Sequence, residues 1–116
     1  MSDREILNEI INAVAEQIYE YLMHKLPSRL LNEITINVGF VDLNNYTLEI
    51  SIDASTNPLL SKLEHIINDA VEFGFKIADY LMDKFKRGEL VGLSPGEIER
   101  IAAEYAKSLR NNPQTR

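Results

Sequence analysis

His24 and His65 are the side chains of this sequence with the most versatile chemistry. Imidazole can ligate a metal or carry a proton, but a metal site needs further ligands at a short, defined spacing. No second histidine lies within one helical turn of either residue, and the chain has no cysteine. We therefore expect no metal, no cofactor and no histidine-based catalytic triad.

Carboxylates are the next candidates, because several fall on one polar face of a long periodic segment. The charged residues of this face are Glu64, Asp69, Glu72, Lys76, Asp79 and Asp83. Clustered carboxylates can bind divalent cations. A solvated helix face, with Glu72 pairing to Lys76 one turn later, explains the same pattern better. Since the glycines also form no phosphate-binding loop, we expect a protein that is not an enzyme.

A basic cluster, Lys84, Lys86 and Arg87, is the one candidate for phosphate contacts. Cations in the last turn of a helix favour its dipole, and this is the simpler interpretation. The net charge is −6, and residues 1–57 hold nine acids against three bases. Because phosphate neutralisation supplies most non-specific affinity for nucleic acids, this charge argues against direct nucleic-acid binding.

The elements that would carry these side chains begin with a helix over residues 3–26. Ser2 and Glu5 have the spacing of a capping box, and Pro27 prevents the helix from continuing. Its apolar positions recur at helical spacing and include Leu7, Ile11, Val14, Ile18 and Leu22.

A β-hairpin is predicted over residues 33–53, where the apolar period changes from helical spacing to two. Residues 34–40 and 46–52 alternate apolar and polar side chains, and Asp42 and Asn45 lie in the segment between them. Asparagine and aspartate favour tight turns. The sequence offers no third strand, so we expect at least one open sheet edge.

Two more helices follow, over residues 58–87 and 95–110, with a polar tail at 111–116. Asn57 and Pro58 favour the start of the long helix, and Gly88 favours its end. Ser94 and Glu97 form a second capping-box pattern. The predicted fold class is α+β with the order α-β-β-α-α in a single domain, residues 1–110, completed by a dimer or another partner.

The long helix has an apolar arc of about 220°, whereas a surface helix needs about 100°. Its central stripe should cover the hairpin, and apolar residues flank that stripe on both sides. The predicted partner-binding residues on these flanks are Ile66, Phe73 and Tyr80 on one side and Phe75 and Met82 on the other. Helices of the same chain can cover one flank, so we expect a second copy or a different protein on the other. Gly74 would let another helix approach closely.

Residues 32–81 read NEITINVGF, then NNYTLEISIDAS, then TNPLLSKLEHIINDAVEFGFKIADYL. This pattern of a hairpin and a long helix resembles the archaeal small dimerisation subunit of the KEOPS complex and its uncharacterised archaeal paralogues. KEOPS installs a threonylcarbamoyl group on tRNA adenosine, and its small subunit is non-catalytic and docks on a larger ATP-binding subunit. The resemblance implies a KEOPS-like accessory subunit that forms a homo-oligomer, binds such an ATP-binding partner, or does both.

Two alternatives remain open: a small RNA-binding module and a chaperone-like assembly protein. The first predicts salt-dependent tRNA binding through the basic cluster. No segment has the apolar length of a membrane span or the pattern of a signal peptide, so we expect a cytoplasmic protein without a membrane contact.

Overall fold

The computed structural model describes residues 2–54 and 58–111. The elements are α1 (Asp3–Lys25), α2 (Ser28–Leu31), β1 (Ile34–Asp42), β2 (Thr47–Ala54), α3 (Pro58–Lys62), α4 (Glu64–Lys86) and α5 (Pro95–Asn111). The α+β class and the order of helix, antiparallel hairpin, long helix and C-terminal helix are confirmed. The predicted helix cap at Asn57 and residues 112–116 of the predicted tail lie outside the described residues.

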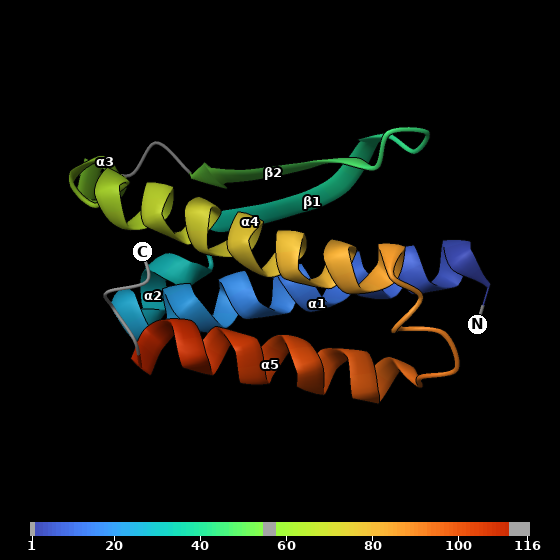
Figure 1. Cartoon of the computed structure of the whole chain (residues 1–116). Helices are drawn as coiled ribbons and strands as arrows, with labels where there is room; N and C mark the ends of the chain where they lie inside the picture. Colours follow the sequence, from blue (N-terminus) through green and yellow to red (C-terminus); the bar gives the residue numbers. More distant parts are fainter. Residues whose placement is uncertain (1, 55–57, 112–116) are drawn as a thin grey trace.

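The elements form three layers (Figure 1). The long helices α1 and α4 lie side by side in the middle layer and run in opposite directions. The hairpin covers one face of this pair, with β1 over α1 and β2 over α4. Helix α5 covers the opposite face and contacts α1 more extensively than α4.

The N-terminal ends of α1 and α5 are capped by the residues that the sequence predicts as caps. In α1 the amide of Ser2 donates to Glu5 Oε1 at 2.8 Å, and the amide of Glu5 donates to Ser2 Oγ at 3.3 Å. Ser94 and Glu97 make the same reciprocal pair at the start of α5, at 2.9 and 3.2 Å. Both capping boxes are confirmed, since each satisfies two backbone donors that a helix start leaves unpaired.

The hairpin pairs β1 and β2 in antiparallel register, with Ile36 opposite Ile52 and Val38 opposite Ile50. The register shifts between Phe40 and Asp42, where the strand carries a bulge. In the turn, Asp42 Oδ1 accepts from the amide of Asn44 at 3.0 Å. The predicted tight turn is therefore confirmed, and β1 is the irregular strand while β2 is not interrupted.

Helix formation breaks at Leu63, which differs from the predicted uninterrupted helix over residues 58–87. Leu63 has φ −107° and ψ 18°, outside the helical region. Its carbonyl accepts from the amides of Ile66 at 2.9 Å and Ile67 at 3.3 Å, so α4 starts here without a side-chain cap. Apolar periodicity predicts which face of a helix is buried. It does not predict that one residue within the segment has non-helical backbone angles.

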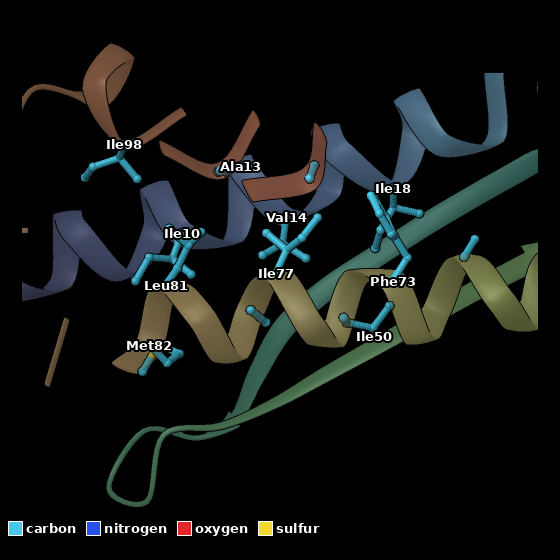
Figure 2. Packing of buried hydrophobic residues seen from close by; sticks show 14 of the residues in the cluster. Ile10, Ala13, Val14, Ile18, Ile50, Phe73, Ile77, Leu81, Met82 and Ile98 are labelled. Atoms are coloured by element: carbon cyan, nitrogen blue, oxygen red, sulfur yellow. The ribbon is translucent and has the colours of Figure 1, made fainter. Parts of the chain in front are cut away.

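The core lies between α1 and α4. Figure 2 shows Ile10, Val14 and Ile18 of α1 opposite Leu81, Ile77 and Phe73 of α4. Ile18 also lies against Gly74, so the close helix approach expected at this glycine is made by α1 of the same chain. Among the described residues, no helix is long and apolar enough to span a membrane.

Candidate functional site

One of the two apolar flanks of α4, predicted to carry Ile66, Phe73 and Tyr80, is covered within the chain. Phe73 is 7% exposed, and its ring centroid lies 4.8 Å from that of Tyr21 on α1. Tyr80 stacks on Tyr105 of α5, with centroids 3.9 Å apart and planes 2° apart. Ile66 is half-buried near the start of α4. Phe73 is therefore buried against α1, whereas Tyr80 is half-buried against α5.

The other flank of α4 remains partly open beside β2. Met82 is buried, whereas Phe75 is 36% exposed. A cavity of about 330 Å³ lies between this flank and the hairpin. We call it the β2–α4 groove; its lining residues are Tyr46, Leu48, Phe75, Ala78, Asp79, Met82, Asp83 and Lys86. Of the five predicted partner-binding residues, the structure brings Phe75 and Met82 together in one groove.

Sequence reasoning missed Tyr46 and Leu48 as lining residues. Tyr46 has a positive φ of 54° at the end of the turn, and its ring meets that of Phe85 edge to face, with centroids 5.6 Å apart. The alternation in β2 does place Leu48 on the inner face. The alternation does not show which strand lies over α4. In the structure β2 lies over α4, and this placement brings Leu48 to the groove.

Among the residues that the structure describes, the sheet has only the strands β1 and β2, so both edges of the hairpin lack a neighbouring strand. No backbone hydrogen bond joins residues 47–54 to any described residue outside the hairpin. The inner face is incompletely covered: only Ile50 is buried, while Ile36, Val38 and Ile52 are half-buried. The hairpin therefore has unpaired backbone groups and uncovered apolar surface at the same place.

The charges near the β2–α4 groove are mostly negative. Asp83 pairs with Arg87 at 2.8 Å, which compensates its charge. Asp79 on α4 and Glu49 on the outer face of β2 form no ion pair with any residue that the structure describes. Lys86 is the single base among the lining residues.

A second and larger cavity, of about 860 Å³, lies where α1, α4 and α5 meet. Its lining residues are Tyr21, His24, Lys25, Asp69, Glu72, Phe73, Phe75, Lys76, Leu109 and Arg110. Its charges have both signs, so the lining favours neither an anion nor a cation. His24 Nδ1 lies 2.8 Å from the carbonyl oxygen of Glu20, a local contact within α1.

The basic cluster is largely engaged in ion pairs. Lys84 Nζ lies 3.2 Å from Glu89 Oε1, and Arg87 contacts both Asp83 and Glu89. The hydrogen bond that Lys84 Nζ donates to Glu89 raises the pKa of Lys84 above its usual value. Lys86 is the one member of the cluster without such a partner in the described part of the chain.

The charged side chains on the polar face of α4 do not come together in one binding site. The predicted pair between Glu72 and Lys76 is not formed, and the i,i+4 pair of this helix joins Asp83 to Arg87 instead. Across residues 2–54 and 58–111, no three histidine or carboxylate side chains lie close enough to hold a metal ion.

Comparisons with protein-family models, with curated proteins and with solved structures found no match.

Proposed function

We propose that this chain is a non-catalytic, cytoplasmic interaction subunit that binds another protein through β2 and the neighbouring flank of α4. The observation that carries the proposal is the unfinished two-stranded sheet. Its inner face is half-covered, and no strand in the described part of the chain pairs with the outer edge of β2. A two-stranded hairpin is marginal by itself, and an added strand or helix would complete both its hydrogen bonding and its apolar burial.

Burial of the exposed apolar surface gives the energetic reason for a partner. Burying a large apolar side chain stabilises by about 1.5–3 kcal/mol, in proportion to the area removed from water. Phe75 is the largest exposed side chain lining the β2–α4 groove, and Leu48 beside it is half-buried. A partly exposed aromatic side chain that lines a small groove is the type of residue that often dominates interface energies.

The resemblance to the KEOPS small subunit supports the same surface. Residues 32–81 carry that resemblance, and they include β1, β2 and most of α4, the elements that form the groove. By this resemblance the partner is a larger, catalytic, ATP-binding subunit that acts in threonylcarbamoyl modification of tRNA. The present chain would then be an accessory or paralogous subunit without chemistry of its own.

The RNA-binding alternative has less support. Two of its three proposed phosphate contacts, Lys84 and Arg87, are held by Glu89 and Asp83. Freeing them would cost those interactions, and the chain as a whole carries a charge of −6. No observation favours the chaperone-like alternative, which differs from the proposal in having no fixed partner.

The test is co-expression of the full chain with a KEOPS-type ATP-binding catalytic subunit, followed by light scattering on the purified complex. We expect a complex of fixed stoichiometry that is lost in Phe75→Asp. The matched control is Tyr19→Asp, because Tyr19 is also an exposed aromatic residue but lies on α1. A chain that stays free of this subunit, or a complex equally sensitive to both variants, would contradict the proposal.

A further inference from the structure

The open edge of β2 is more regular than that of β1. β1 is kinked by the bulge between Phe40 and Asp42, and bulges hinder the addition of another strand. β2 pairs without interruption from Thr47 to Ala54, and the β2–α4 groove lies beside it. A strand added to this edge would place every second side chain over the groove and the others on the outer face of the sheet.

The outer face next to this edge carries two acids. Side chains on one face of a strand recur every two residues, so Glu49, Ser51 and Asp53 share the outer face of β2. The opposite residue to Glu49 on β1 is Gly39, which has no side chain to offset the charge. Asp53 accepts a hydrogen bond from Asn37 Nδ2 at 2.9 Å, but a neutral amide leaves its charge in place.

We infer that β2 accepts an extended segment of another protein in which two basic residues, four positions apart, alternate with apolar residues. The basic residues lie beside Glu49 and Asp53 on the outer face. The apolar residues between them point into the β2–α4 groove, over Phe75 and Met82. The inference rests on the proposed function and specifies the chemistry of the partner at that surface.

Charge disfavours a second copy of this chain as the occupant of the edge. Neither β1 nor β2 contains a lysine or an arginine. A β2–β2 pair would bring two copies of Glu49 and Asp53 to one four-stranded face without any cation between them. Like charges across neighbouring strands are destabilising, whereas opposite charges are favourable.

The probe for this inference is the peptide acetyl-VKVTVKV-amide, whose two lysines share one face of a strand. Its control is the isomer acetyl-VKVTKVV-amide, which has the same composition and charge but places the lysines on opposite faces. Fluorescence anisotropy on the full chain measures both affinities. The control keeps one lysine on the outer face, so the loss of one favourable cross-strand pair predicts that the first peptide binds about 1.4-fold to fivefold more tightly.

Two variants of equal charge change locate the binding site. Glu49→Lys should remove most of the preference for the first peptide. Glu104→Lys should leave it unchanged, because Glu104 is exposed on α5, in the layer farthest from the hairpin. Amide hydrogen exchange over residues 47–54 should slow when the first peptide is added, since an added strand occupies the outward backbone groups of β2.

Each other outcome has a defined meaning. Equal affinities for the two isomers, or unchanged exchange over residues 47–54, would overturn the inference. A concentration-dependent dimer of the free chain in which these amides are protected would also overturn it, because the second copy would then be the occupant. The complex with the ATP-binding subunit can still form and still depend on Phe75 when any of these three results is observed. In that case the inference fails and the proposed function stands.

Discussion

Gly74 of α4 lies so close to Ile18 of α1 that a Cβ atom on the glycine would stand 2.5 Å from Ile18 Cδ1. The same atom would lie 3.1 Å from Ile50 Cδ1 of β2. Real Cβ atoms do not approach other carbons this closely. Gly74 is therefore the point at which α1, α4 and the hairpin meet, and its lack of a side chain lets α4 lie close to both α1 and β2.

Gly74→Ala should destabilise the protein although alanine is the better helix former. The helix-propensity gain is about 1 kcal/mol, whereas overpacking a filled core costs about 1–3 kcal/mol. Ile18 is fully buried and has little room to move. We expect a net loss of about 1 kcal/mol, measured as a lower urea midpoint at an unchanged slope.

The matched control for this variant is Gly96→Ala, near the start of α5. A Cβ there would meet nothing closer than Ser94 Oγ at 4.0 Å. Alanine at this helical position should be neutral or stabilising. If Gly74→Ala were as stable as Gly96→Ala, the close contact with Ile18 would not determine the distance between α1 and α4.

Phe73 and Phe75 are two residues apart on α4 but should respond very differently to substitution. Phe73 is buried against Tyr21, so Phe73→Ala should cost about 3–5 kcal/mol of unfolding free energy. Phe75→Ala should cost less than about 1 kcal/mol, because this ring already contacts solvent. Chemical denaturation of both variants checks the difference. Comparable losses would mean that Phe75 is a core residue and unsuitable for probing an interface.

Tyr80 and Tyr105 should be energetically coupled, since their stacked rings join α4 to α5. Aromatic pairs of this kind contribute about 0.5–1.5 kcal/mol beyond their area burial. A double-mutant cycle with Tyr80→Leu and Tyr105→Leu should therefore give a coupling free energy of about 1 kcal/mol. Strictly additive effects would show that the two rings do not stabilise each other.

Stability should decrease in acid partly through the capping box of α5. The hydrogen bond from the backbone amide of Ser94 lowers the pKa of Glu97 below its usual 4.5. A carboxyl whose pKa is lowered by folding stabilises the native state above its unfolded pKa, and this contribution disappears as the pH falls through the lowered pKa. Glu97→Gln should therefore show a weaker loss of urea stability between pH 7 and pH 3 than the parent chain.

The control for the acid effect is Glu104→Gln, also on α5 but outside the cap. It should keep the acid sensitivity of the parent chain. The prediction is wrong if both glutamine variants follow the parent chain over the whole pH range.

The full chain should not shift tRNA in an electrophoretic assay at about 0.15 M salt. Ion pairs with Asp83 and Glu89 occupy Arg87 and Lys84, and a net charge of −6 repels the phosphate backbone. Binding that weakens steeply with salt and is lost on neutralising Lys84, Lys86 and Arg87 would restore the RNA-binding alternative.

The sequence by itself determined the main helices and the hairpin, because the relevant interactions are local; it did not predict the short helix α2 or the break between α3 and α4. The capping boxes at Ser2 and Ser94 and the aspartate turn at Asp42 use partners within three residues. The alternation in β2 identifies its inner face for the same reason, since strand geometry sets it residue by residue. The departure at Leu63 was not predictable, because no side-chain cap marks it.

Only the tertiary structure decided which apolar surface remains open. The helical wheel of α4 does not distinguish whether Phe73, Tyr80, Phe75 and Met82 are buried or exposed, because it gives the direction of a side chain around one helix and not which element lies in that direction. Packing of α1 buries Phe73 and packing of α5 half-buries Tyr80. The placement of β2 over α4 leaves Phe75 beside a strand edge that no described strand pairs with. These contacts join residues far apart in the chain, so sequence periodicity contains no signal for them.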